Sequence, residues 1–488
     1  MLLRGQDVHH FRFRARTASL CRGPGNIPRP RRPAPLAIAA VPALRGARGS
    51  RALRRVRDAA GEVYARAWYP LCFTAVTDQG KPHHLDLCGV AVVFWHDGEA
   101  WRAARDACPH RGVRLSEGRL NERSLQCPYH GWAFDGAGRC VSIPQAEKEK
   151  ASSARKGACL RMLPTEERQG LLFAWAAPLY GDAAPPDLGL LEELAHEEIL
   201  GTEGVKYVDY SRDLPMDLPI LMENVLDPAH LPFTHHGTIS QRERASSVPI
   251  QTTSSFNGFT GERSTSPGGG LAFFAPNHVW ALTQRPESFR DWNLVYGTPL
   301  AEDSCRVFVR VVFEVSKVPM PLRLVFQYAF SDQLPAFFTH LSNHRVLEDD
   351  NVFLHYQGKS MKSEELPTYT PSTSDAAVLA YRDWLRRNGT CVRAGSGTVP
   401  GGMLTRAQLV ERLRSHTEHC ASCSQALALA RGAQAPAEAA VLLGLLGAAL
   451  DGHAAFAFAA SLGFALRLAA RSLEEKLTVG EYPPPRNS

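Results

Sequence analysis

The sequence has few cysteines for its length, and its first part almost lacks acidic residues. Eleven cysteines are spread over 488 residues, whereas a small secreted disulfide scaffold carries its cysteines far more densely. An odd count in a long chain indicates mostly reduced thiols, with some of them committed to metal. The hydrophobic share of 44% and the charged share of 21% are those of an ordinary globular protein with room for two or three domains.

The basic surplus of the chain is confined to its N-terminal segment. Residues 1–57 contain fourteen arginines, and Asp7 is the only acidic residue among them. The net charge of the whole chain is +6, so the remainder is slightly acidic, which argues against a nucleic-acid-binding face. The segment also lacks the continuous apolar core of a secretory signal. Its Arg-rich, proline-broken composition, which mitochondrial and chloroplast transit peptides share, predicts a targeting peptide over residues 1–60, with a disordered basic tail as the alternative.

The rest of the chain divides into three predicted parts, and no internal repeat is visible. Short apolar strands with turn signals at Asp97-Gly98 and Asp135-Gly136 predict a small antiparallel β domain over residues 63–180. A Gly/Pro/Asp-rich linker then leads to a larger mixed α+β region, residues 194–425. This region has a strand-like run at 305–316, a helix-like run at 375–389 and a flexible insert at 392–402.

The last part, residues 437–470, is hydrophobic. Its two apolar runs, Ala439–Leu450 and Ala454–Leu466, are separated by Asp451-Gly452-His453. Each run is shorter than the roughly 20 residues that a helical membrane span requires. A buried helical pair, a re-entrant hairpin and two spans therefore all stay open. The fold class expected for the whole chain is α+β, with a C-terminal apolar helical pair.

The most specific signal is a pair of Cys/His motifs inside the small β domain. Cys108-Pro109-His110 is followed, after sixteen residues, by Cys127-Pro128-Tyr129-His130-Gly131. Mixed pairs of this kind predict a Rieske [2Fe–2S] cluster, in which Cys108 and Cys127 hold one iron and His110 and His130 hold the other. Zinc is the alternative, but zinc fingers place cysteine with cysteine and histidine with histidine.

A second motif, about a hundred residues later, predicts a mononuclear iron site. It reads Asn224-x-x-Asp227-x-x-His230-x₄-His235. Two histidines five residues apart on a bent helix can face one metal, and a carboxylate from elsewhere would complete a facial triad with open positions for dioxygen and substrate. His236 competes by proximity, but the spacing favours His235.

The missing carboxylate has three adjacent candidates, Glu348, Asp349 and Asp350, which precede an apolar helical pattern. The alternative for these acids is a helix N-terminus, where negative charge is favoured by the helix dipole. One acid can be a metal ligand while the others only interact with the helix dipole. Position alone does not select Asp350.

With both motifs in place, the chain resembles the pheophorbide a oxygenase family of Rieske non-haem iron oxygenases from plants and algae. The resemblance covers nearly everything after the first sixty residues and includes "CPHRGVRLSEGRL", "LQCPYHGWAFDGAGRCVSIPQA", "LMENVLDPAHLPFTHH" and "LTRAQLVERLRSHTEHCASC". That family also includes the protochlorophyllide-dependent translocon component and a Rieske component of the inner-envelope translocon. The resemblance implies a Rieske domain followed by a helix-grip-like catalytic domain.

The resemblance also implies roles for particular residues and partners. Asp350 occupies the position of the family's ligand aspartate, and Asp227 that of the aspartate that connects the cluster of one subunit to the iron of its neighbour. A homotrimer follows from that connection. The family further implies that residues 1–60 are a plastid transit peptide, that ferredoxin is the electron donor, and that the location is a chloroplast membrane, inner envelope or thylakoid.

The reaction implied by the resemblance is the oxygenation of a chlorophyll-derived tetrapyrrole with O₂, with pheophorbide a as the expected substrate. One alternative is oxidation of a methyl group on chlorophyllide a or protochlorophyllide a, and another is a redox component of the inner-envelope protein translocon. An apolar pocket for a wide macrocycle has four candidate wall residues, for each of which ordinary core packing is the alternative. They are Phe273, Phe274, Trp280 and Phe326.

A last constellation, His416-x₂-His419-Cys420-x₂-Cys423, admits three interpretations. Four possible ligands so close together could bind zinc. The family resemblance implies that Cys420 and Cys423 form a redox-active dithiol under thioredoxin control. Two inert buried thiols are the third possibility, because a C-x-x-C pair must be exposed to react.

Overall fold

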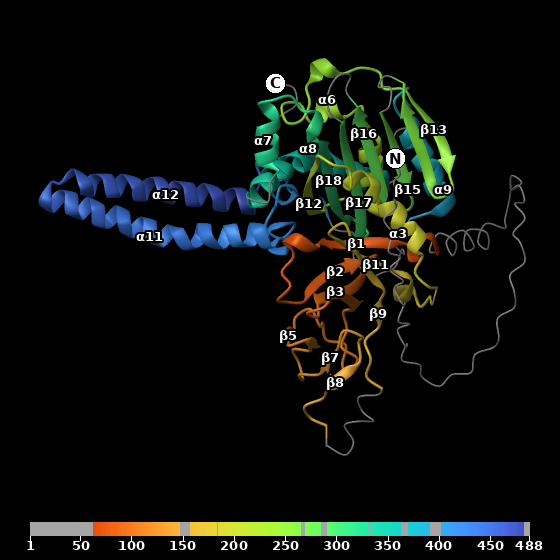
Figure 1. The fold of residues 1–488 in the computed structure, drawn as a ribbon, viewed down its shortest axis with the longest axis horizontal. Coiled ribbons are helices and arrows are strands. Elements are labelled where there is room, and N and C mark those ends of the chain that lie inside the picture. The colour runs from red at the N-terminus through yellow and green to blue at the C-terminus, as the bar shows by residue number, and fades with distance from the viewer. Residues whose placement is uncertain are drawn as a thin grey trace, which may run out of the picture.

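The computed structural model describes residues 62–146, 157–182, 184–264, 269–284, 290–330, 334–362, 369–390 and 402–482. The predicted transit peptide and nearly all of the predicted insert at 392–402 lie outside the described residues. Figure 1 shows a small β-rich lower body, an upper body built on a large sheet, and a long helical arm that points away from both.

The lower body consists of small antiparallel sheets, as the turn signals predict. In the hairpin of β3 and β4, Gly98 adopts a φ of 91°, and between β7 and β8 Gly138 adopts a φ of 77°. Glycine tolerates this left-handed conformation without steric cost, which explains the turns at these points. The sheets are β1 (Trp68–Phe73), β11 (Leu171–Trp175) and β10 (Thr165–Arg168); β2 (His83–Leu87), β3 (Val90–His96), β4 (Trp101–Arg105) and β9 (Met162–Leu163); and β5 (Arg119–Asn121), β6 (Ser124–Gln126), β7 (Ala133–Phe134) and β8 (Cys140–Ser142).

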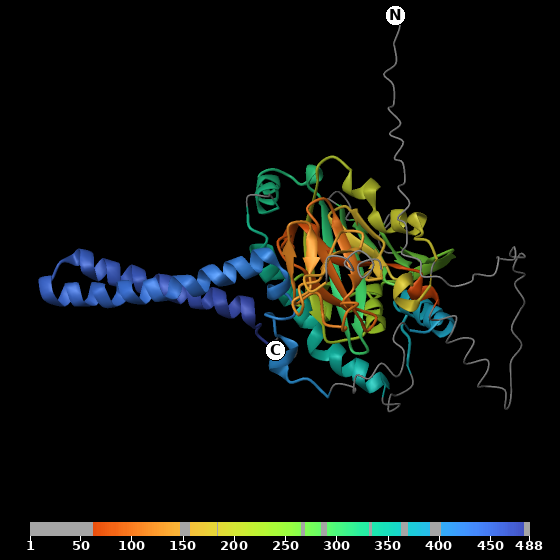
Figure 2. The same ribbon diagram turned by 90° about the horizontal axis from the view of Figure 1, so that it is seen from below.

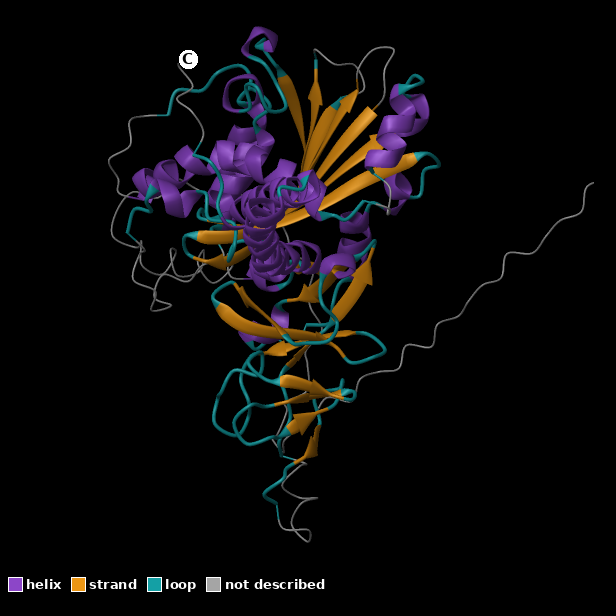
Figure 3. Cartoon of the chain, turned by 90° about the vertical axis from the view of Figure 1, so that its left-hand side faces the viewer, coloured by secondary structure: helices purple, strands orange, loops and turns teal. Residues whose placement is uncertain are grey.

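The upper body is a seven-stranded antiparallel sheet that packs against helices (Figures 1 and 3). Six strands form a meander, and the first strand of the region returns to the edge beside the last. In sheet order the strands are β12 (Val205–Leu214), β18 (Ser304–Glu314), β17 (Arg290–Ala301), β16 (His278–Gln284), β15 (Gly270–Phe274), β14 (Gly258–Arg263) and β13 (Ile250–Ser255). The helices are α5 (Leu218–Leu226), α6 (Leu231–Thr234), α7 (Leu322–Ala329), α8 (Phe337–Lys362), α9 (Ala376–Asn388) and α10 (Arg406–Leu409).

The main hydrophobic core lies between this sheet and the helices α5 and α9. Phe273 of β15 is buried there, with ring centroids 5.0 Å from Tyr381 and 5.2 Å from Trp384 of α9. Phe326 of α7 packs on Phe313, at 6.1 Å between centroids. Phe273 therefore belongs to the core rather than to a substrate pocket, in line with the alternative that the sequence left open.

The two bodies pack together through the opposite face of the large sheet. Trp68 and Trp175 share a buried cluster with Trp292 of β17. Backbone bonds cross the junction from Cys88 N to Pro299 O at 2.8 Å and from Gly89 N to Leu300 O at 2.7 Å. The predicted linker begins with a 3-10 helix at Ala177–Tyr180. Two short helices come next: α3 (Leu188–Ala195), whose N-terminus is capped by the Asp187 side chain, and α4 (Glu197–Leu200).

The arm is an antiparallel pair of long helices, α11 (Ala421–Asp451, 31 residues) and α12 (Ala454–Thr478, 25 residues). Each predicted apolar run is thus the outer part of a longer helix, and both helices pass the length and composition test for a membrane span. Gly452, at a φ of 65°, ends α11 at the tip. Gly444 lies so close to α12 that an added Cβ would come within 2.6 Å of the backbone of Ala460, so small residues permit the close packing. Figure 2 shows the arm extending far beyond the body.

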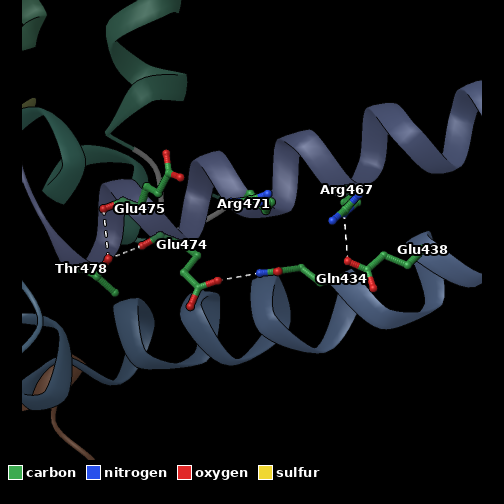
Figure 4. Close-up of a pocket in the computed structure, with 7 residues that line it drawn as sticks. All are labelled: Gln434, Glu438, Arg467, Arg471, Glu474, Glu475 and Thr478. Atoms are coloured by element: carbon green, nitrogen blue, oxygen red, sulfur yellow. Dashed lines mark hydrogen bonds and ion pairs between the residues drawn. The ribbon is translucent and has the colours of Figure 1, made fainter.

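The two ends of the arm differ in polarity. Near the body, polar side chains connect the helices: Gln434 donates to Glu474 at 2.6 Å, and Arg467 pairs with Glu438 at 2.9 Å (Figure 4). Farther out the arm exposes large apolar side chains. They are Leu442, Leu443, Leu445, Leu446, Leu450, Phe456, Phe458, Leu462, Phe464 and Leu466.

Candidate metal centres

The four predicted cluster ligands come from two loops with matching backbones, one after β4 and one between β6 and β7. In the first loop Gly112 N donates to Cys108 O at 2.8 Å, and in the second Gly131 N donates to Cys127 O at 3.2 Å. Both glycines have a positive φ, 72° and 71°. A glycine four residues after each cysteine therefore gives both loops the same tight reversal. As a result each histidine lies beside its cysteine.

The loops bring the four ligands to one place. Cys108 and Cys127 are buried, while the rings of His110 and His130 lie 4.7 Å apart between their centroids and are only partly covered. Trp132 stacks on His110 at 4.5 Å. Burial raises the pKa of Cys108 to about 11, so a positively charged metal is needed to hold this thiol as thiolate.

The residues present fit a mixed-ligand cluster. Within the part of the chain that the structure describes, Nδ1 of His110 is buried and has no hydrogen-bond partner. Such an atom is costly unless something binds its lone pair. The thiols form the inner side of the site and the imidazoles the outer side, which is the division that a Rieske cluster requires.

The second predicted centre lies where α5 ends and α6 begins. Pro228 disfavours helical backbone at the residue before it, and the helix stops at Leu226. His230 and His235 then flank the single turn of α6. Asp350, from the middle of α8, joins them, and the three donor atoms lie within 4.8 Å of one another. Nε2 of His235 is 3.4 Å from Asp350 Oδ2, and Nε2 of His230 is 4.0 Å from Asp350 Oδ1.

Neighbouring groups aim both imidazoles at Asp350. Nδ1 of His230 donates to the backbone carbonyl of Asp227, and Nδ1 of His235 lies 3.4 Å from Asp349 Oδ2. Each ring therefore presents its Nε2 to the third ligand, as in metal sites where an outer partner fixes the tautomer. Burial lowers the pKa of His230 to about 4, so its ring is neutral and its lone pair is available.

The three adjacent acids lie in the interior of α8, so the helix N-terminus considered for them is wrong. The helix begins at Phe337, well before the acids. Glu348 accepts hydrogen bonds from two buried arginines: Arg212 Nη1 at 2.9 Å, and Arg412 Nε and Nη2, each at 2.7 Å. Asp349 contacts His235, and only Asp350 faces both histidines.

The remaining residues of the motif also have defined hydrogen-bond partners. Asn224 Nδ2 donates to Asp350 Oδ1 at 3.3 Å, and Asp227 Oδ1 accepts from Ala229 N at 2.7 Å. His236 faces away from the triad, and its Nδ1 accepts from Arg242 N at 3.2 Å. The roles of Asn224 and Asp349 escaped the sequence reasoning. The three-residue spacing of Asn224, Asp227 and His230 could have indicated a common helix face for Asn224, whereas nothing in the sequence marks Asp349.

The C-terminal Cys/His constellation is only partly as expected. Cys420 and Cys423 are buried free thiols, and His416 lies beside them. His419 instead turns outward to Asp213, 3.9 Å away, and His340 of α8 takes the fourth place. His340 precedes His416 by 76 positions, so a motif of neighbouring residues could not have included it.

Comparison with known proteins matches a Rieske [2Fe-2S] domain over residues 67–164 and a pheophorbide a oxygenase domain over residues 273–367. The chain is 34% identical over 402 residues to pheophorbide a oxygenase of Arabidopsis thaliana, covering 74% of this chain and 72% of that protein. It is 30% identical over 386 residues to flavonoid 8-hydroxylase 2 of Ocimum basilicum, covering 74% and 73%.

The fold is similar to that of NdmA from Pseudomonas putida CBB5, with a TM-score of 0.51 and 19% identity, covering 67% of this chain and 91% of that one. This likeness confirms the α+β class. The two domain matches and the 34% identity over about three quarters of the sequence show that the chain belongs to the pheophorbide a oxygenase family of Rieske non-haem iron oxygenases, which carry a [2Fe–2S] cluster and a mononuclear iron.

Proposed function

We propose that this enzyme uses reduced ferredoxin and dioxygen to oxygenate a chlorophyll-derived tetrapyrrole, opening the ring of pheophorbide a. One observation carries the proposal. The donors of His230, His235 and Asp350 converge in a chain that is 34% identical to a pheophorbide a oxygenase over 402 residues. A purely redox subunit of a translocon would not need this second centre.

The residues around the triad have separable tasks. When bound there, iron supplies open coordination positions at which dioxygen is activated. His230 and His235 offer neutral nitrogens, and Asp350 offers the negative charge. Asn224 holds Oδ1 of Asp350 by its amide, and Asp349 fixes the ring of His235. These outer contacts keep the ligand side chains in one rotamer, so the site stays ordered between turnovers.

Electron delivery is proposed to cross between subunits of a homotrimer at Asp227. The cluster loops next to β5–β8 and the triad at α6 and α8 lie at opposite ends of one chain (Figure 1). Asp227 holds the ring of His230 through its backbone carbonyl, and its own side chain is 27% exposed. A neighbouring cluster histidine could therefore reach its carboxylate and, through it, the iron ligand.

The surface beside the triad suits a flat apolar substrate with a carboxylate. Phe233 and Ile239, which lie within four residues of His235 in sequence, are 54% and 57% exposed. The short helical turn Arg242–Arg244 packs against α6 and supplies cations that a propionate group could use. A contiguous exposed apolar patch commonly marks a binding surface.

The arm is proposed to attach the enzyme to a chloroplast membrane, inner envelope or thylakoid, after removal of the transit peptide. The apolar run from Ala439 to Leu450 contains 12 residues. At about 1.5 Å per residue it reaches roughly 18 Å, short of the roughly 30 Å hydrocarbon core. With charged pairs at its root and Asp451 at its tip, the arm is best suited to enter one leaflet.

The reaction is tested with purified protein, reduced ferredoxin and isotopically labelled dioxygen. The substrate panel contains pheophorbide a, chlorophyllide a, protochlorophyllide a and a flavone, because one relative is a flavonoid hydroxylase. Ring opening should bleach the main visible bands and give a labelled open-chain product by mass spectrometry. A labelled product with an intact macrocycle would establish methyl oxidation instead. Turnover of the flavone alone would show that the substrate is a flavonoid rather than a tetrapyrrole. No turnover at all would favour the translocon role.

A further inference from the structure

Four metal-binding side chains meet at the root of the arm, apart from both proposed iron centres. His340 comes from α8, His416 from the segment before α11, Cys420 from the N-terminal boundary of α11 and Cys423 from its first turn. All four residues are buried, and their donor atoms lie within 4.8 Å of one another.

The spacing of the donors matches the edges of a tetrahedron around zinc. Nδ1 of His340 lies 3.1 Å from Nε2 of His416, 3.5 Å from Cys420 Sγ and 3.4 Å from Cys423 Sγ. Nε2 of His416 lies 3.3 Å from Cys423 Sγ. With Zn–N near 2.0–2.1 Å and Zn–S near 2.3 Å, tetrahedral edges are about 3.3–3.8 Å. These four distances differ from the edges by a few tenths of an ångström, so a filled site would need only a slight expansion.

The hydrogen bonds of the two imidazoles leave their inner nitrogens as acceptors. Nδ1 of His416 bonds the carbonyl of Ser211 at 2.6 Å, and Nε2 of His340 bonds the carbonyl of Asp209 at 3.1 Å. A carbonyl can only accept, so the outer nitrogen of each ring carries the proton. Two inner lone pairs then face each other at 3.1 Å, an arrangement that needs a cation or protons between them.

We propose that His340, His416, Cys420 and Cys423 bind a structural zinc ion that fastens the arm to the catalytic domain. Two thiolates and two neutral imidazoles form a closed tetrahedral set, which is the usual donor set of structural zinc. Binding releases the two thiol protons and leaves an electrically neutral complex, which suits a buried position. The carbonyls of Ser211 and Asp209, both from β12, orient the imidazoles, as outer partners do in metal sites.

Burial distinguishes this site from an accessible redox pair. Cys420 is 3% exposed and Cys423 is 0% exposed. A thioredoxin-type partner must reach a sulfur to exchange with it, and reactive cysteines are at least partly exposed. The ring of Tyr210, stacked on His416 at 4.8 Å, covers the site from the side of the sheet.

The position of the site explains what a zinc ion would do. His340 and Asp350 lie ten residues apart on α8, about 15 Å along the helix axis. The zinc would join this helix directly to α11. The arm and the iron ligand would thereby share one rigid connection.

The first test is the metal content of the purified full chain. We expect about one zinc per chain in addition to the cluster irons and the mononuclear iron. Cys423→Ser and His340→Gln should each lower the zinc content about tenfold or more while the Rieske spin-resonance signal persists. His419→Gln is the matched control and should keep its zinc, because His419 faces Asp213. Unchanged zinc in Cys423→Ser, or iron in place of zinc, would overturn the proposal.

A second measurement on the wild-type chain avoids any folding defect of the variants. X-ray absorption at the zinc edge should report two sulfur neighbours at about 2.3 Å and two nitrogen neighbours at about 2.0 Å. Fastening is tested by limited proteolysis, in which the zinc-free variants should be cut faster ahead of α11. A wild-type chain without zinc, whose Cys420 and Cys423 form a disulfide that thioredoxin reduces, would replace the metal site by a redox switch.

Discussion

Three adjacent acids on α8 acquire three different partners. Successive side chains on a helix point about 100° apart, so Glu348, Asp349 and Asp350 leave the axis in different directions. Glu348 meets Arg212 and Arg412, Asp349 meets Nδ1 of His235, and Asp350 meets Nε2 of the same ring. Their chemistry is nearly identical, and only direction separates a structural acid, a positioning acid and a ligand.

Asp350→Ala should abolish both the mononuclear iron and the activity, because it removes the carboxylate of the triad. Asp349→Asn should retain the iron site but weaken iron binding by about 10- to 100-fold, since the partner of His235 Nδ1 changes. Iron titration of each variant measures this order. The Rieske signal of both should match wild type, and equal iron affinities in Asp349→Asn and wild type would contradict the positioning role.

Glu348→Gln should destabilise the upper body by about 3–5 kcal/mol, because two buried arginines lose their shared counter-charge. The measurement is the loss of secondary structure on heating, compared with wild type at the same metal content. Glu438→Gln, which breaks the partly exposed pair with Arg467, is the control and should cost no more than about 1 kcal/mol. A Glu348→Gln variant as stable as the control would refute the assigned role of this ion-pair network.

His110→Cys should lower the reduction potential of the cluster, because a thiolate replaces a neutral imidazole and adds negative charge. Protein-film voltammetry or a redox titration of the spin-resonance signal measures the change. A zinc-only metal analysis of the wild-type protein would instead reject the cluster assignment.

At the scale of elements, the break between α5 and α6 shapes the proposed iron site. The break at Asp227-Pro228 lies before both histidines, which stand at the two ends of the single turn of α6, Leu231–Thr234. Because α6 starts anew after the break, its turn can lie against α8, where both rings meet Asp350. The irregular backbone is therefore part of the site.

The arm should bind membranes through its outer apolar surface. Leu443→Asp combined with Phe458→Asp, at side chains that are 67% and 71% exposed, should shift the protein from the floating to the soluble fraction in a vesicle flotation assay. Burying a charge in hydrocarbon is costly, which is the physical reason. Leu188→Asp, on exposed α3 away from the arm, is the control. Flotation of the double variant at the wild-type level would exclude insertion of this surface.

At the scale of the whole molecule, the separation of the two proposed centres within one chain predicts complementation between chains. His110→Ala and Asp350→Ala should each be inactive alone, because one lacks the cluster and the other the iron. Co-expressed in one trimer they should regain activity, since an intact cluster can then face an intact iron site. Oxygenation of the substrate by the purified mixed trimer is the measurement. No recovery in verified mixed trimers would place electron transfer within a single chain.

Asp227→Asn gives a kinetic prediction for the proposed electron transfer between subunits. Both metals should stay bound, while oxidation of the cluster in a single turnover should lag behind wild type. Stopped-flow absorption of the cluster follows this step. A wild-type rate would leave Asp227 with only its local bonds to Ala229 and His230.

The sequence by itself determined the features whose residues are close in the chain. The proposed cluster ligands fall within residues 108–130, and the glycine turns that arrange them are in the same loops. The hairpins of the lower body and the histidine pair at the iron also follow from local spacing, because turn geometry and helix periodicity act over a few residues. The helix at 375–389 was predictable for the same reason, and α9 spans Ala376–Asn388.

The tertiary structure decided what depends on distant segments. The packing of α8 near α6 decides which of the three acids faces both histidines of the proposed iron site, and it also places Asp349 beside His235. His340 joins Cys420 only because α8 packs beside the first turn of α11. The length of the arm helices could not be predicted from the apolar runs either, because the inner halves of these helices are too polar to extend the runs. Contacts between residues 76 to 120 positions apart depend on packing of the whole chain, which no local pattern encodes.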